Sequence, residues 1–105
     1  MFNKILEATG LPYKESRFLK PPSSSYVVFN DSIERRGGDT INLITQHDIT
    51  FELYSYKPDP EAEKLIEDQL DLFSIEWTKE SRYWIQEEQI YQVIYEFSYI
   101  KKGGL

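Results

Sequence analysis

The side chains in this sequence that could do chemistry are few, and their spacing does not build a catalytic site. The single histidine, His47, is next to Asp48. Adjacent residues of a strand point to opposite faces, so these two do not form a hydrogen-bonded pair. There are no cysteines, which excludes disulfides, thiol catalysis and thiolate metal sites. We therefore expect His47 to lie at the protein surface or at a strand edge.

Two small groups of carboxylates are close enough in the sequence to be considered as chemical sites. Glu63, Glu67 and Asp71 are four residues apart, which places them along one side of a helix. Glu87 and Glu88 are neighbours in a predicted turn. Carboxylates on successive helical turns lack the oxygen-rich loop of a calcium site, and a general acid–base pair needs a pocket that shifts one pKa. We expect both groups to be solvated, with no bound metal.

The glycine pair Gly37-Gly38 is not a phosphate-binding loop, because the further glycines and the following helix of such loops are missing. With one histidine and no cysteine, a zinc site lacks its usual ligands. The sequence therefore predicts a protein that is not an enzyme, that uses no cofactor and that works by binding.

The charge balance argues against nucleic-acid recognition. The chain has 18 acidic and 12 basic residues, a net charge of −6, whereas a protein that binds phosphates needs a basic face. The basic pairs Arg35-Arg36 and Lys101-Lys102 are isolated. An acidic surface repels DNA, which suits a wall past which DNA slides without specific binding.

The length of 105 residues corresponds to one domain, which we assign to residues 1–100, with a flexible C-terminal tail over 101–105. No apolar stretch is long enough for a transmembrane helix, and the N-terminus lacks the apolar core of a signal peptide. We expect a protein made and used in a cytoplasm, or in a particle assembled there, without contact to a membrane.

Periodicity and breakers predict the elements that would position these residues. The strongest signal is a helix start at Asp59-Pro60, with an N-cap acid before proline. The expected elements are a helix over 2–9, strands over 26–29 and 47–56, a helix over 59–73, and strands over 75–79 (resuming at 83–85) and 90–100. They predict a two-layer α+β fold of order α-β-β-α-β-β, with about four mainly antiparallel strands and both helices on one face.

The polar stretch 30–46 between the first two predicted strands has two interpretations. It is either a long β-hairpin with a glycine turn or an extended arm that becomes ordered against a partner. The eight tyrosines suit half-buried strand faces and interfaces. The candidate interface residues are Arg35, Arg36, Gly37, Gly38, Tyr54, Tyr56 and Tyr91.

Four segments give the chain a recognisable layout across residues 2–99. They are the opening helix with Gly10-Leu11-Pro12, the proline-led entry into strand 26–29, the strand 49–55 that leads to Asp59-Pro60, and the final strand 90–97. This layout resembles the tail-completion proteins (tail terminators, or head–tail joining proteins) of long-tailed phages and of prophages in Gram-positive bacteria.

The resemblance implies a mixed α/β domain without cofactor or enzymatic activity. It implies a ring, commonly a hexamer, that caps the tail tube and joins it to the head in the virion, with DNA passing through. The partners would be further copies of the chain, the tail tube protein and a head-closure or connector protein. The isolated chain would be either a monomer or already a ring. The candidate lumen surface is the acidic helix side at Glu63, Glu67 and Asp71, with ordinary solvent exposure as the alternative.

Two other functions fit the same sequence. One is a head-closure or other minor connector protein of the same phage neck. The other is a small host module that binds a protein partner, for which acidic charge and surface tyrosines are equally suitable. A chain that stays monomeric at all concentrations and does not bind tail tubes would favour the host module.

Overall fold

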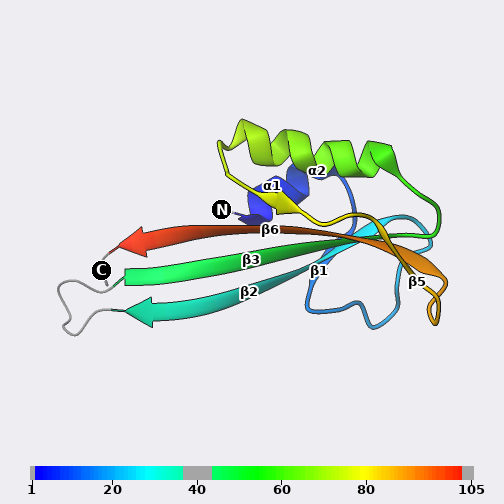
Figure 1. Ribbon diagram of the computed structural model, residues 1–105, viewed down its shortest axis with the longest axis horizontal. Helices are drawn as coiled ribbons and strands as arrows, with labels where there is room; N and C mark the ends of the chain where they lie inside the picture. The colour runs from blue at the N-terminus through cyan, green and yellow to red at the C-terminus, as the bar shows by residue number, and fades with distance from the viewer. Residues whose placement is uncertain (1, 37–43, 103–105) are drawn as a thin grey trace.

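The structure is a computed structural model in which residues 2–36 and 44–102 are described (Figure 1). The sheet has the strand order β1-β2-β3-β6-β4, and β5 also pairs with β6. The β1–β2 pair is parallel and the other pairs are antiparallel. The elements are α1 (Phe2–Thr9), β1 (Tyr13–Glu15), β2 (Tyr26–Arg36), β3 (Ile44–Ser55), α2 (Pro60–Leu72), β4 (Thr78–Lys79), β5 (Tyr83–Ile85) and β6 (Ile90–Lys102).

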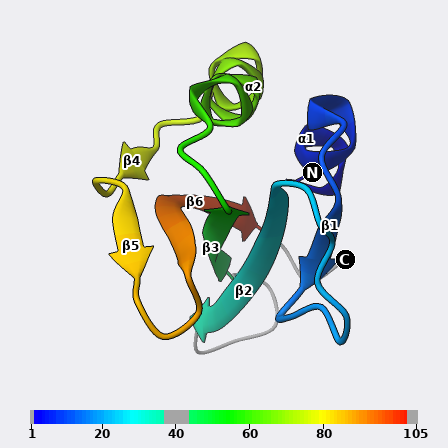
Figure 2. The same ribbon diagram turned by 90° about the vertical axis from the view of Figure 1, so that its right-hand side faces the viewer.

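Both helices lie on the same face of the sheet (Figures 1 and 2). Helix α1 lies above β1 and β2, and α2 lies above the side of the sheet that β6 and β4 form (Figure 2). Strands β2, β3 and β6 extend past the ends of both helices as a three-stranded arm (Figure 1). In the described part of the chain, neither helix has the length and hydropathy needed to cross a membrane.

The helix boundaries confirm the signals read from the sequence. Helix α1 ends at Gly10, whose φ of 75° is the left-handed conformation that favours glycine, and whose N–H donates to the Glu7 carbonyl at 3.2 Å. Helix α2 begins after Asp59, whose carboxylate accepts a hydrogen bond from the Ala62 N–H at 3.1 Å. Pro60 occupies the first turn, where its missing N–H costs nothing.

The main core lies between the helices and the odd-numbered side chains of the long strands. Full burial of each such side chain contributes about 1.5–3 kcal/mol. Leu65 of α2 and Phe73, the residue that follows α2, are 42% and 39% exposed and lie outside this core. The buried members of this core are Ile5, Leu6, Val27, Phe29, Ile49, Phe51, Leu53, Ala62, Ile66, Leu70, Val93, Tyr95 and Phe97.

The fold is α+β, but the prediction of four mainly antiparallel strands in the order α-β-β-α-β-β was wrong. The sheet has six strands and is mixed, and the order is α-β-β-β-α-β-β-β. Strand β1 was missed because three residues are too few to show alternation. The third predicted strand was misplaced, since within residues 75–85 only Thr78–Lys79 and Tyr83–Ile85 pair with β6.

The polar stretch between the first two predicted strands proves to be mostly strand. Strand β2 continues to Arg36 and β3 begins at Ile44, and the two pair antiparallel over their whole lengths. This is the long hairpin rather than the arm that waits for a partner. The glycine pair Gly37-Gly38 lies outside the described residues. At the other end, β6 reaches Lys102, two residues further than the predicted strand.

Candidate functional site

The face of the sheet away from the helices carries three carboxylates among its described side chains. We call it the open face; it consists of the even-numbered residues of β2, β3 and β6. Asp48 and Glu52 come from β3 and Glu96 from β6, and the register places them in successive rows, about 7 Å apart along the strands. Among the side chains that the structure describes on these three strands, this face carries no lysine or arginine.

Neighbouring hydroxyl groups orient two of these carboxylates. The Ser98 hydroxyl donates to Asp48 Oδ1 at 2.6 Å, and the Tyr54 hydroxyl donates to Glu52 Oε1 at 2.7 Å. The Tyr54 hydroxyl does not neutralise the charge of Glu52, because the donor is uncharged. The open face therefore presents the negative charges of Glu52 and Glu96.

Two strand edges of the arm have no strand partner in the described part of the chain. Strand β1 covers the outer edge of β2 only at 27–29, which leaves residues 30–36 without a neighbour. Strands β4 and β5 cover the outer edge of β6 only up to Glu96, which leaves residues 97–102. We call these segments the β2 edge and the β6 edge. Exposed edges of this length are templates for pairing with another chain.

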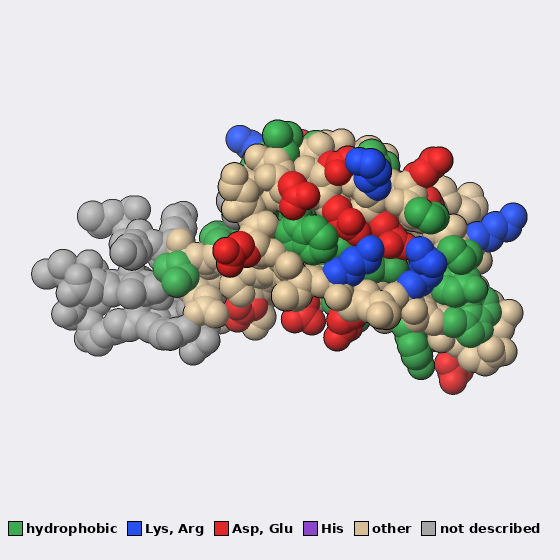
Figure 3. All heavy atoms as spheres, turned by 45° about the horizontal axis from the view of Figure 1, so that its top comes forward, with side chains coloured by type: hydrophobic (Ala, Val, Ile, Leu, Met, Phe, Trp, Pro, Cys, Tyr) green, Lys and Arg blue, Asp and Glu red, His purple; other side chains and the backbone are tan. Residues whose placement is uncertain are grey.

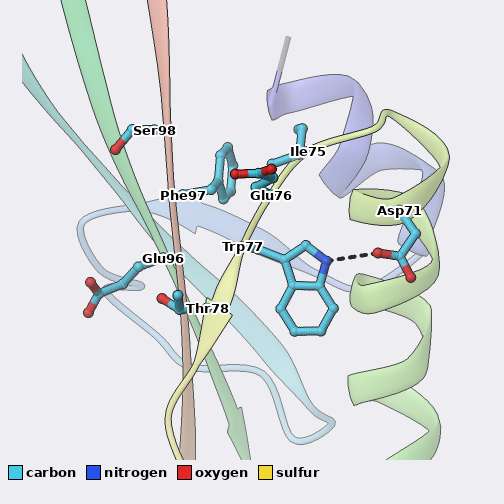
Figure 4. Close-up of a pocket in the computed structure, with 8 residues that line it drawn as sticks. All are labelled: Asp71, Ile75, Glu76, Trp77, Thr78, Glu96, Phe97 and Ser98. Atoms are coloured by element: carbon cyan, nitrogen blue, oxygen red, sulfur yellow. Dashed lines mark hydrogen bonds between the residues drawn. The ribbon is translucent and has the colours of Figure 1, made fainter.

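A groove of about 760 Å³ runs along the β6 edge, lined by Phe97 from the helix side of the sheet and by Glu96 and Ser98 from the open face (Figure 4). Its wall on one side is Trp77, whose indole N–H donates to Asp71 Oδ1 of α2 at 2.9 Å. The other wall comes from β6. We call it the Trp77 groove, and its lining residues are Asp71, Ile75, Glu76, Trp77, Thr78, Glu96, Phe97 and Ser98.

The predicted lumen residues Glu63, Glu67 and Asp71 all have partners within the fold. Asp71 accepts the Trp77 indole N–H. Glu63 pairs with Lys79 at 2.8 Å and with Arg82 at 2.7 Å, and Glu67 pairs with Lys79 at 2.6 Å. Figure 3 shows acidic and basic side chains interleaved on the helix side of the molecule.

Burial makes this ionic cluster different from a solvated acidic face. Glu63 is only 7% exposed. Burial raises the pKa of its carboxyl, but the hydrogen bonds and charges of Lys79 and Arg82 outweigh burial and hold that pKa below its usual value. The expectation that Glu63 is solvated was therefore wrong. The cluster holds β4 and the following loop against α2, and a lumen role for its members stays a prediction.

The same cluster accepts a hydrogen bond from the Tyr95 hydroxyl, which lies in the core. The Tyr95 side chain is fully buried, and its hydroxyl donates to Glu67 Oε2 at 2.7 Å. Burial first, and then the Glu67 carboxylate, raise the pKa of Tyr95 well above its ordinary value. The hydroxyl therefore stays protonated and fixes the position of α2 over β6.

The three predicted interface tyrosines differ in exposure. Tyr54 is half-buried on the open face, where its ring stacks on Tyr26 at 5.3 Å, and burial and its bond to Glu52 raise its pKa. Tyr91 packs its ring against Trp84 at 4.7 Å. Tyr56 is 46% exposed and donates to the Pro22 carbonyl at 3.0 Å.

The remaining predicted interface residues lie at the tip of the β2–β3 hairpin. Arg35 and Arg36 belong to β2, opposite Thr45 and Ile44 of β3, but their side chains are outside the described part of the structure. Gly37 and Gly38 are outside it altogether. The tip and Tyr54, Tyr56 and Tyr91 are therefore not brought together as one surface by any described contact.

His47 is neither at a strand edge nor next to a nucleophile. It lies on the central strand β3, with its side chain 15% exposed. Its Nδ1 is 2.9 Å from Asp31 Oδ2, and its ring stacks on Tyr99 at 4.5 Å. The prediction of its position was wrong because the hairpin is longer than expected. Ring stacking and one carboxylate hold the histidine in place as a structural residue of the arm.

Among the described residues, no group of three or more His, Asp or Glu side chains is arranged to hold a metal ion. Comparison with known proteins adds no relative. No family model and no curated protein sequence matches the chain. Its function must therefore be inferred from the residues and their geometry.

Sequence reasoning identified the alternation of β3 and β6 but missed the open face. Asp48 and Glu52 are 44 or more residues from Glu96 in the chain, and only the β3–β6 register places them together. The signal present in the sequence was that Asp48, Glu52 and Glu96 all occupy even-numbered positions of the predicted strands. The register that joins the two patterns into one surface depends on tertiary packing.

Proposed function

We propose that this chain is a structural, non-enzymatic subunit of a phage or prophage tail, and that it forms a ring that terminates the tail tube and joins it to the head. The observation that carries the proposal is the open face. A long, helix-free sheet face with carboxylates in three successive rows is suited to line a channel for DNA.

Electrostatics supports a channel wall that does not bind DNA. The charges of Glu52 and Glu96 act over about 8–10 Å at physiological salt, which covers the first layer of solvent beside the wall. Phosphates in that layer are repelled. The part of this face whose side chains are described carries no lysine or arginine, so that part offers no partner for a phosphate contact. DNA would pass through the channel without specific binding. The proposed role requires no cofactor.

Two further observations support assembly into a ring. The β2 edge and the β6 edge lie on opposite sides of the same sheet, and a head-to-tail contact that covers both edges generates a ring when the rotation closes. The layout of the sequence resembles tail-completion proteins, in which a hexamer is common. The partners would be the tail tube protein and a head-closure or connector protein.

The first test is assembly on tail tubes of the encoding phage or prophage. The purified chain is mixed with tubes that lack it and imaged by electron microscopy, and its size in solution is measured by light scattering. The expected result is a ring that caps one end of each tube. Binding to the head connector instead would indicate the head-closure function, and binding to neither structure would refute the proposal in favour of a host binding module.

The second test concerns the charge of the open face. The variant Glu52→Lys/Glu96→Lys is compared with Glu61→Lys/Asp68→Lys, which makes the same charge change on exposed positions of α2. We expect the open-face variant to retain double-stranded DNA in an electrophoretic assay of the assembled ring, and the native and helix variants not to do so. Equal retention by both variants would show that the open face does not line the channel.

A further inference from the structure

The loop between β1 and β2 presents an exposed, basic surface. We call residues 16–25 the basic loop, because they include Arg17 and Lys20 and no acidic residue. Neither cation has an ion-pair partner in the described part of the chain. Between them, Leu19 is 85% exposed, the highest value among the large apolar side chains that the structure describes. The loop therefore carries an apolar side chain between two unpaired positive charges.

The basic loop is fixed to the sheet on both sides of its exposed leucine. Before the leucine, the Phe18 ring packs against the Tyr26 ring, with the ring centres 5.2 Å apart. After it, the Pro22 carbonyl accepts a hydrogen bond from the Tyr56 hydroxyl at 3.0 Å. A surface that is held in place before contact loses little conformational entropy on binding. The leucine is therefore suited to act as an anchor in a groove of a partner.

The Trp77 groove has the complementary character. The side chains of Trp77, Ile75 and Phe97 give it apolar walls (Figure 4), and none of the described residues that line it is a lysine or arginine. Asp71 of α2 and Glu76, in the segment between α2 and β4, line the same groove, and neither has an ion pair among the described residues. An apolar groove with an acidic rim matches an apolar anchor flanked by cations.

The basic loop and the Trp77 groove lie on opposite sides of the domain. In the strand order β1-β2-β3-β6-β4, the loop follows β1 at one end and the groove adjoins β4 at the other. Figure 2 shows the loop on the right and β4 on the left. One copy can therefore offer its loop to a second copy and its groove to a third. Such a head-to-tail contact generates a ring when the rotation closes.

This contact leaves the short outer strands in place. A loop side chain enters the groove, so neither the outer side of β2 nor the outer side of β6 has to pair with a strand of the other copy. Strand β1 keeps its position beside β2, and β4 keeps its position beside β6. The contact therefore depends on side chains and charge rather than on backbone hydrogen bonds.

We infer that the Trp77 groove of one copy receives the basic loop of a second copy. Leu19 packs against Trp77, and Lys20 faces Glu76 at the rim. This inference rests on the proposed ring, and it names the two surfaces that build it. A two-fold contact between two grooves is disfavoured, because it would bring their carboxylates together.

The first test is disulfide trapping between two single-cysteine variants, which the absence of cysteine from the sequence makes possible. Leu19→Cys is mixed with Thr78→Cys, at a position that lines the groove, and the assembled protein is mildly oxidised. In the control mixture, Glu61→Cys replaces Thr78→Cys. Helix α2 places Glu61 about 15 Å from Asp71, which is beyond the reach of a disulfide. Circular dichroism checks that each variant is folded.

We expect the mixture of Leu19→Cys and Thr78→Cys to give a covalent dimer on a denaturing gel. Each variant alone, and the control mixture with Glu61→Cys, should stay monomeric. Because each chain has one thiol, a dimer that appears only in the first mixture must join a loop to a groove. Dimers from Leu19→Cys alone, or equal amounts from the two mixtures, would overturn the inference.

The second test exchanges charges across the contact. Lys20→Glu and Glu76→Lys should each weaken assembly about tenfold, because like charges then face each other. The double variant Lys20→Glu/Glu76→Lys should recover assembly, and Glu61→Lys, on an exposed position of α2, should assemble like the native chain. Light scattering measures each assembly. Unchanged assembly of both single variants, or a double variant no better than either, would contradict the inference.

The failure of this inference and the failure of the proposed function have different signatures. If the native chain forms rings but the loop and groove cysteines do not crosslink, the ring stands and the contact is wrong. If the native chain assembles neither in solution nor on tail tubes, the proposed function fails and the contact fails with it.

Discussion

The carboxylates on the two faces of the sheet have different kinds of partner. On the helix-covered side, Glu63 is buried and has two cationic partners, Lys79 and Arg82. On the open face, Glu52 accepts a hydrogen bond from the uncharged Tyr54 hydroxyl. The difference separates acids that stabilise the fold from acids that are available to act on something outside it. Net charge alone does not make this distinction.

The largest expected effect is on the covered face. Replacing the fully buried Phe51 by Ala should lower the free energy of unfolding by about 3–5 kcal/mol, because it leaves a cavity under both helices. Thr50→Ala, one residue away on the open face, should cost under about 1 kcal/mol. Urea denaturation followed by circular dichroism measures both. Equal costs would mean that the two faces are equally packed, contrary to the structure.

The next effect is the removal of a buried charge. Glu63→Gln leaves Lys79 and Arg82 without their shared partner, and we expect it to lower the free energy of unfolding by about 1–3 kcal/mol, less than for a fully buried pair because both cations are about one-third exposed. The matched control on the same helix is Asp68→Asn. It breaks an exposed pair with Lys64 and should cost under about 0.5 kcal/mol. Similar losses would indicate that Glu63 is solvated.

At acid pH the stabilisation that Glu63 contributes on the covered face should be lost. The pKa of Glu63 is held below its usual value of 4.5, so its contribution is fully present above that value and is lost as pH falls through the lowered pKa. The free energy of unfolding of the native chain should therefore fall more steeply below about pH 4.5 than that of Glu63→Gln. Parallel curves for the two proteins would rule out this contribution.

The smallest effect is expected on the open face itself. Glu96→Gln removes an exposed charge that no described ion pair uses, so the free energy of unfolding should change by less than about 0.5 kcal/mol. Thermal denaturation monitored by circular dichroism is sufficient to detect a larger change. A loss comparable to that of Glu63→Gln would show that the open-face acids are structural and would remove the contrast between the faces.

Local signals in the sequence located the two helices well. The Asp59-Pro60 start and the glycine after Thr9 depend on backbone chemistry within a few residues, and the structure confirms both. Strand β1 gave no such signal, because its only support is a parallel partner. The short β4 likewise depends on contacts with β6 and α2 rather than on its own residues.

The candidate site was harder to predict than the fold, because its chemistry is set by distant partners. Glu63 looked like part of a solvated helix side, but it meets Lys79 and Arg82, 16 and 19 residues away. His47 looked peripheral because the stretch before it could be either a long hairpin or an extended arm, whereas Asp31 contacts it across the hairpin. Helical spacing places residues on one side of a helix but does not say what faces that side.

The position of β6 inside the sheet has a consequence for synthesis on the ribosome. Strand β6 lies between β3 and β4, yet it follows β3 by the 34 residues from 56 to 89. At 5–20 residues per second, translation of that stretch takes roughly 2–7 s. During that interval β3 of the nascent chain can pair with β2 but has no partner on its other side. Early folding intermediates of this protein are therefore targets for chaperones, and the completed sheet exists only after residue 102 has been made.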